Sequence, residues 1–244
     1  MKQVSIRFYA ELNDFLAPER RMVPFPCAFH VSAPVRDLIE SLGVPHTEVD
    51  LILVNGRSAD FSHLVEDGER ISVYPVFESI DIAPVARLRP RPLRQTRFVL
   101  DVHLGRLAAY LRMMGFDSLY RNDCRDEELA RLSGGEERIL LTRDRELLKR
   151  AVVTRGYYVR ATSPRQQLAE VLRRFDLFDS ATPFARCLAC NGVLEPVAKD
   201  AVGELLPPRV RERHDEFLRC DACARVYWKG SHHARMTKII EALR

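Results

Sequence analysis

Residues 97–115 read RFVLDVHLGRLAAYLRMMG, and they join a short apolar run to a segment with helical periodicity. The first apolar residues predict the end of a buried strand. Apolar residues then recur every three or four positions, which predicts one packed face of a helix. Asp101 lies between the two, at the carboxyl end of the strand, where open α/β sheets build their binding crevices. The alternative interpretation is that Asp101 caps the helix.

The same alternation of strand and helix continues after this stretch. Periodicity predicts strands at 97–101, 117–120, 138–142 and 156–160, with helices at 104–114, 126–132, 144–151 and 164–175. Strands that alternate with helices indicate a parallel sheet covered on both sides. The sequence therefore predicts an α/β domain over residues 97–180.

Acidic residues follow three of these strands. Asp144 comes directly after ILLT, as Asp101 comes after FVL, and Asp126 belongs to an acidic group that follows the second strand. Strands of a parallel sheet end at one edge, so we expect the three carboxylates to converge there. Oxygen ligands of this kind suit magnesium or manganese, which can activate water against a phosphodiester. Each acid alone is also compatible with a helix cap.

Two C-x-x-C pairs near the C-terminus predict a metal site. The pairs are Cys187 with Cys190 and Cys220 with Cys223, and 29 residues lie between the first pair and the second. Each pair can supply two thiolates to one tetrahedral zinc. A zinc with four thiolates has no open position, so this site is expected to be structural. A redox role for one pair is the weaker alternative because neither follows a strand of a thioredoxin-like unit. Residues 181–244 thus predict a zinc ribbon with a C-terminal helix.

These motifs together resemble the Mut-seven-C RNase family, a branch of the PIN-like nucleases. The resemblance lies in FVLDVHLGRLAAYLRMMGFDSLYRND, DEELA, ILLTRDREL, the cysteine pairs and VYWKGSHHARM. It implies a metal-dependent ribonuclease with Asp101, Asp126 and Asp144 at the acidic site. PIN-like nucleases usually carry a fourth acid after a later strand, where this chain has only Thr162 and Ser163. The number of catalytic metals therefore stays open.

Residues 1–80 predict a separate β-grasp domain. Alternating apolar residues at 3–10, a helix in SAPVRDLIESLG capped by Ser32, and strands in LILVNGR and EDGERISVYPV give its elements. The region resembles the ubiquitin-like sulfur carriers of the ThiS/MoaD type. Those carriers end in Gly-Gly, whereas this chain runs on into FESIDIAPV, so sulfur transfer is not expected. A protein partner that binds this domain is the expectation instead.

Charge divides the chain into an acidic and a basic part. Residues 1–80 carry 7 Lys and Arg against 12 Asp and Glu, a net charge of −5, whereas residues 81–244 have a net charge of +9. The basic part favours a polyanionic partner such as RNA. Residues 81–96, rich in arginine and proline, predict a linker. No run of apolar residues is long enough to cross a membrane and no secretory signal is evident, which favours a cytoplasmic location.

The sequence thus predicts a β-grasp domain, a linker, a PIN-like parallel-sheet domain and a zinc ribbon. RNA is the expected substrate, and the side chains expected to contact it are Arg106, Arg143, Arg145, Trp228 and Lys229. Trp228 has an equally weighted alternative, which is to complete the small core of the ribbon. The rival function is a non-catalytic RNA-binding or ribosome-associated adaptor whose β-grasp domain recruits a partner.

Overall fold

The computed structural model describes residues 1–75, 88 and 96–243, and its contacts divide the chain into two compact units. The first unit joins Met1–Gln95 to Arg125–Tyr158, and the second joins Thr96–Cys124 to Val159–Arg244. The predicted linker at 81–96 falls almost wholly outside the described residues, and the predicted domain boundaries stay predictions. In the described part of the chain, no helix is long and apolar enough to span a membrane.

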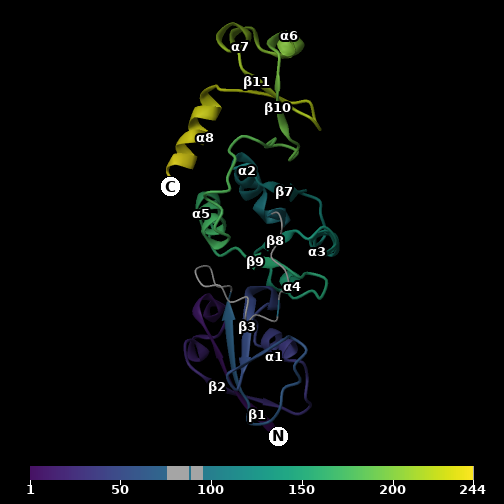
Figure 1. The fold of residues 1–244 in the computed structure, drawn as a ribbon, viewed down its shortest axis with the longest axis vertical. Coiled ribbons are helices and arrows are strands. Elements are labelled where there is room, and N and C mark those ends of the chain that lie inside the picture. Colours follow the sequence, from purple (N-terminus) through teal and green to yellow (C-terminus); the bar gives the residue numbers. More distant parts are fainter. Residues whose placement is uncertain (76–87, 89–95, 244) are drawn as a thin grey trace. The chain divides into compact units, whose positions relative to one another are not determined.

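The N-terminal residues form a β-grasp domain, drawn in purple and blue in Figure 1. Its strands are β1 (Lys2–Phe8), β2 (Phe25–Phe29), β3 (Val49–Val54), β4 (Arg57–Ala59) and β5 (Arg70–Pro75), in the sheet order β2-β1-β5-β3-β4. The central strands β1 and β5 run parallel, and the other neighbours run antiparallel. Helix α1 (Val35–Ser41) contributes Val35 and Ile39 to the buried core. Three short 3-10 helices complete the domain: Ala10–Phe15, Pro18–Arg20 and His46–Glu48.

Two local predictions in this domain have different outcomes. The Asn55-Gly56 turn forms as expected, with φ of 51° and 81°, and pairs Val54 with Arg57. Positive φ at both central residues suits Asn-Gly in a hairpin. The prediction that Ser32 caps the helix was wrong, because α1 begins later and its N-cap is Pro34. The fixed φ of proline favours a helix start immediately after it.

Residues 125–158 complete the first unit with two parallel strands and two helices. These elements are α3 (Asp126–Gly135), β8 (Ile139–Thr142), α4 (Arg145–Leu148) and β9 (Gly156–Tyr158). Helix α4 is a single turn, shorter than the predicted 144–151. The fully buried pattern of β8 explains why its sequence shows no alternation.

The second unit begins with a strand, a helix and a parallel strand. They are β6 (Arg97–Leu100), α2 (Gly105–Met113) and β7 (Asp117–Tyr120), with a short 3-10 helix, Val102–Leu104, before α2. Helix α5 (Pro164–Arg174) packs against α2. The ring of Phe98 on β6 contacts those of Phe116 and Phe175 edge-on, at centroid distances of 6.4 and 5.7 Å. Buried apolar side chains thus join the first helix of this region to its last one.

The C-terminal residues form a small antiparallel ribbon. Its strands are β10 (Leu194–Val197), β11 (Phe217–Cys220) and β12 (Val226–Trp228), and β11 is central. The charged insert between the cysteine pairs holds α6 (Lys199–Val202), a 3-10 helix (Gly203–Leu205) and α7 (Pro208–Arg213), and α8 (Ser231–Glu241) follows β12. Val202, Leu206 and Phe217 form the core, and Trp228 packs on it.

Candidate metal centre and acidic residues

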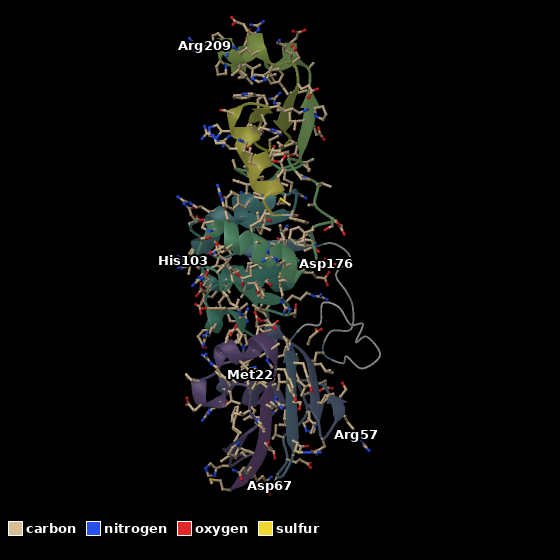
Figure 2. The ribbon with its side chains drawn as sticks, turned by 90° about the vertical axis from the view of Figure 1, so that its left-hand side faces the viewer. Met22, Arg57, Asp67, His103, Asp176 and Arg209 are labelled. Carbon is tan, nitrogen blue, oxygen red and sulfur yellow. The ribbon has the colours of Figure 1, made fainter. Side chains whose placement is uncertain are left out.

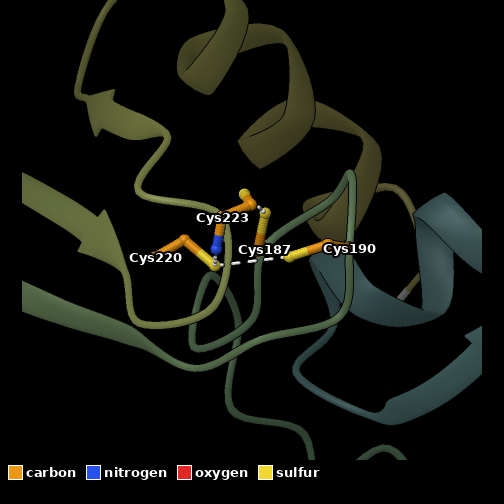
Figure 3. A group of neighbouring side chains, drawn as sticks. All are labelled: Cys187, Cys190, Cys220 and Cys223. Carbon is orange, nitrogen blue, oxygen red and sulfur yellow. Dashed lines mark hydrogen bonds between the residues drawn. The ribbon is translucent and has the colours of Figure 1, made fainter.

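The four cysteines of the two C-x-x-C pairs, here called the cysteine cluster, lie together at the base of the ribbon (Figure 3). Their sulfur atoms lie within 4.8 Å of one another, with Cys187 Sγ 3.7 Å from Cys223 Sγ and Cys190 Sγ 3.4 Å from Cys220 Sγ. In a tetrahedral site with metal–sulfur bonds of about 2.3 Å, neighbouring sulfurs are about 3.8 Å apart. The cluster therefore has the spacing that a four-thiolate metal site requires.

The two loops that carry the cysteines have matching backbone structure. Asn191 N donates to Cys187 O at 3.0 Å, and Ala224 N donates to Cys220 O at 3.1 Å. The residue after each pair has a positive φ, 73° at Asn191 and 58° at Ala224. A Cβ atom at Gly192 would lie 2.7 Å from Cys220 Sγ, so a glycine is needed there for the two loops to approach.

Two thiols of the cluster differ in acidity. Burial opposes ionisation of Cys187, but hydrogen bonds from the Tyr227 hydroxyl and from backbone N–H groups lower its pKa to about 6. Burial raises the pKa of Cys190 to about 12. The loop thus presents one thiolate at neutral pH, the form in which cysteine binds metals.

Arg112 of α2 attaches the first cysteine loop to the α/β residues of the second unit. Its side chain is 4% exposed, and its Nε donates to Ser118 O at 2.9 Å. Its Nη1 donates to the carbonyls of Leu188 and Ala189, at 3.1 and 2.9 Å, between the two cysteines of the loop. Because the guanidinium is buried beside thiols that ionise on binding a metal, its positive charge offsets theirs.

Asp101 is placed as predicted, directly after β6. It is 5% exposed, and although it occupies the N-cap position of the following 3-10 helix, its side chain makes no capping hydrogen bond. The cap interpretation for this residue is therefore wrong. His103, two residues further on, is exposed and is labelled at the surface in Figure 2.

Asp144 and Asp126 both belong to the first unit. Asp144 follows β8 and caps α4, because its Oδ1 accepts from Glu146 N at 2.8 Å and from Leu147 N at 3.4 Å. Asp126 is exposed and is the first residue of α3, with Arg125 as the N-cap. The cap interpretation thus holds for Asp144, although one carboxylate oxygen suffices for it. A metal site formed by these acids with Asp101 stays a prediction.

The basic side chains expected to contact RNA have different surroundings. Arg106 is exposed on α2, and Arg143 is partly buried between β8 and α4. The Arg145 guanidinium lies over the rings of Phe15 and Tyr158, 5.0 and 5.6 Å from their centroids, and donates to Phe15 O at 3.5 Å. Arg145 therefore has a structural partner in the β-grasp domain.

Further polar contacts join the β-grasp domain to residues 125–158. The carboxylate of Glu48, which is fully buried, accepts from Tyr158 N at 2.5 Å. The ring of His46 bridges Glu40 and the Val153 carbonyl, with nitrogen–oxygen distances of 2.6 and 2.8 Å. These contacts could not be predicted from the sequence, because isolated acids and a histidine in a 3-10 turn resemble ordinary surface residues.

Trp228 and Lys229 line a pocket of the ribbon. The pocket has a volume of about 580 Å³ and is lined by the ribbon sheet, the segment before it and α8. Trp228 is half-buried and packs on the ribbon core, which supports the core interpretation, and its contact with RNA stays a prediction. His233 stacks on Phe184, with ring centroids 4.2 Å apart, and the cysteines form a four-ligand set without it.

These features define a class of protein: an α/β region of PIN-like type, preceded by a β-grasp domain and followed by a four-cysteine ribbon. Residues 96–240 match the family model described as the Mut7-C RNAse domain, and residues 1–81 match that of the Mut7-C ubiquitin domain. The chain therefore belongs to the Mut7-C RNase family, as the sequence motifs led us to expect. No curated protein and no solved structure matches it.

Proposed function

We propose that this protein is a metal-dependent ribonuclease and that Asp101, Asp126 and Asp144 hold the catalytic cation. The observation that carries the proposal is the match of residues 96–240 to an RNase domain family. The position of Asp101 supports it, because this 5% exposed carboxylate directly follows β6, at the carboxyl end of a strand where α/β sheets build their binding sites. Carboxylate oxygens are the ligands that magnesium and manganese prefer.

Each acid has a distinct part in the proposed site. Burial of Asp101 strengthens its attraction for a cation, because the dielectric constant is low there. The backbone N–H groups of Glu146 and Leu147 orient Asp144 through Oδ1. A bound magnesium or manganese ion would supply positive charge to the reacting phosphate and favour deprotonation of the attacking water. Arg106, Arg143, Arg145, Trp228 and Lys229 are proposed to hold the RNA strand.

Zinc is the metal that we propose for the cysteine cluster, with a structural role. Four thiolates at these distances leave no coordination position for substrate. The cluster would then hold the ribbon in place while the acidic residues carry out hydrolysis.

The test is RNA cleavage by zinc-loaded protein with magnesium, with manganese and with chelator. Asp101→Asn and Asp144→Asn are the informative variants, because asparagine removes the charge at nearly constant size and, at position 144, can keep the helix cap. We expect cleavage to fall by roughly a hundredfold or more, as when a group that stabilises transition-state charge is removed. The matched control is Asp179→Asn, at an exposed position outside the proposed site. Equal activity of all four proteins would refute the assignment.

One observation favours a second candidate, an RNA-binding adaptor without catalysis. Ser163 stands where PIN-like nucleases usually have a fourth acid, and its hydroxyl accepts from Gln166 N at 3.4 Å to cap α5. That position therefore serves the fold. RNA binding that weakens steeply with salt, with no cleavage under any metal, would establish the adaptor. A protein partner of the β-grasp domain would have to bind away from the face that contacts residues 145–158.

A further inference from the structure

The pocket beside Trp228 has the size and walls of a site for a flat ligand. Its volume of about 580 Å³ lies within the range of small-molecule sites, about 300–1,000 Å³. Aromatic rings come from four places: Phe184 before the ribbon, Phe217 on β11, Tyr227 and Trp228 on β12, and His233 on α8. Aromatic faces pack best against another flat aromatic group.

Gly230 gives the Trp228 indole the space that it occupies. A Cβ atom at Gly230 would lie 2.8 Å from Trp228 Nε1, closer than such atoms can approach. The glycine after β12 therefore permits the ring position from which Trp228 lines the pocket. Any larger residue at 230 would move the indole.

The mouth of the pocket carries charges of both signs. Lys229 Nζ and Glu216 Oε2 are 2.5 Å apart, and their side chains are 67% and 76% exposed. The hydrogen bond from Lys229 lowers the pKa of Glu216, which is thus ionised at neutral pH. An ion pair this exposed contributes little stability, so both groups can exchange their partner for a ligand. Asp215 and Arg186 also line the pocket.

We propose that this pocket binds a single unpaired nucleobase of RNA, with the base against Trp228 and its edge toward Glu216. The proposal deepens the proposed function by naming a recognition site for its substrate. A nucleotide has the flat face that the walls suit, N–H donors for Glu216 and a phosphate for Lys229. An apolar peptide side chain would use the walls but make no polar contact with Lys229 or Glu216, which would stay paired with each other.

The carboxylate makes the pocket selective among bases. Guanine presents two adjacent N–H donors on one edge, which match the two oxygens of a carboxylate. Uracil presents one N–H between two carbonyls, and those carbonyls repel the carboxylate. Guanine is therefore the preferred base and uracil the poorest.

The chain has one tryptophan, so its fluorescence reports directly on this pocket. Zinc-loaded full-length protein is titrated with GMP, AMP, CMP and UMP, which contain no bond for a ribonuclease to cleave. We expect saturable quenching, with GMP bound about tenfold more tightly than UMP, the value of one hydrogen bond to a charged group. Glu216→Gln abolishes that preference, and Glu212→Gln, at an exposed position on α7, retains it.

Three outcomes overturn the proposal: no quenching by any nucleotide, an equal response to all four bases, or an apolar dye that binds the pocket and is not displaced by nucleotides. The last would assign the pocket to another class of ligand, such as a protein segment. Guanine binding without RNA cleavage would refute the ribonuclease and retain the pocket. Cleavage without nucleotide binding would refute the pocket alone.

Discussion

Arg112 and Arg145 each attach a smaller domain to α/β residues of their own unit, but with different chemistry. Arg112 is 4% exposed and donates to three backbone carbonyls, two of which lie in the first cysteine loop. Arg145 is only partly buried and lies over two aromatic rings, and it donates once, at 3.5 Å, to a carbonyl of the β-grasp domain.

The difference indicates how the two attachments are stabilised. A buried arginine that donates to three carbonyls is costly to remove, whereas a partly exposed arginine over aromatic rings contributes modestly. The β-grasp domain has a core of its own, so its contact with residues 125–158 adds specificity to a fold that already exists. The ribbon core is small, so we expect the ribbon to depend on a bound metal and on Arg112.

Metal removal should have the largest effect, and it should affect the ribbon but not the β-grasp domain. A strong chelator is expected to unfold the ribbon, because four-thiolate zinc binding contributes about 10 kcal/mol or more to small domains. Hydrogen exchange would then show loss of protection across residues 186–228, with residues 1–75 unchanged. A ribbon that keeps its protection after complete zinc removal would contradict the metal-dependent attachment.

Replacement of Arg112 by methionine should have the second largest effect. The substitution removes a buried cation beside the thiols and the donor of three carbonyls, of which that of Ser118 is buried, so we expect a loss of about 3 kcal/mol. Urea unfolding measures the loss, and a colorimetric chelator measures the faster release of zinc. Arg112→Lys, which keeps the charge without the fork of donors, should lie between wild type and methionine. Unchanged zinc release would refute the role of Arg112 at the cluster.

Glu48→Ala tests the contact between the β-grasp domain and residues 125–158. It removes the fully buried carboxylate that accepts from Tyr158 N in a part-buried hydrogen bond, at a cost of about 2 kcal/mol. The amide of Tyr158 should exchange faster, and zinc release should not change. Glu19→Ala, at an exposed position in the same domain, is the matched control. Equal exchange of the Tyr158 amide in both variants would rule out the proposed importance of Glu48.

Arg145→Leu should have the smallest effect, about 1 kcal/mol, since it removes cation–π contacts at a partly exposed site. Arg20→Leu is a close control, because the Arg20 guanidinium lies 5.1 Å from the centroid of the Phe25 ring within the β-grasp domain itself. Both should lower the urea midpoint slightly, and only Arg145→Leu should speed amide exchange in residues 145–158. If Arg145→Leu lowered the free energy of unfolding by more than about 3 kcal/mol, the proposed difference between Arg145 and Arg112 would be refuted.

Periodicity and spacing predicted most of the elements and the cysteine cluster, because both are local properties of the chain. The strand before Asp101 and the helix after it lie within a few residues of their predicted positions. The contacts of Arg112, Glu48 and Arg145 could not be predicted. Each joins residues far apart in sequence, and a buried arginine looks like a surface arginine until its carbonyl acceptors are known. Asp144 illustrates a different difficulty. The sequence pattern that predicts its helix cap is the same pattern that predicts a metal ligand, so the sequence alone could not separate the two roles.

The discontinuity of the first unit has a consequence for the order in which the protein matures. Synthesis proceeds from the N-terminus, and domains generally fold as they are completed, so the β-grasp domain is available before residues 125–158 are made. Those residues then meet a finished surface that already presents Phe15 and Glu48. The cysteine cluster is completed last, when Cys220 and Cys223 follow. The N-terminal domain can therefore act as a template during biosynthesis, whereas a metal could bind all four cysteines only after Cys223 has been made.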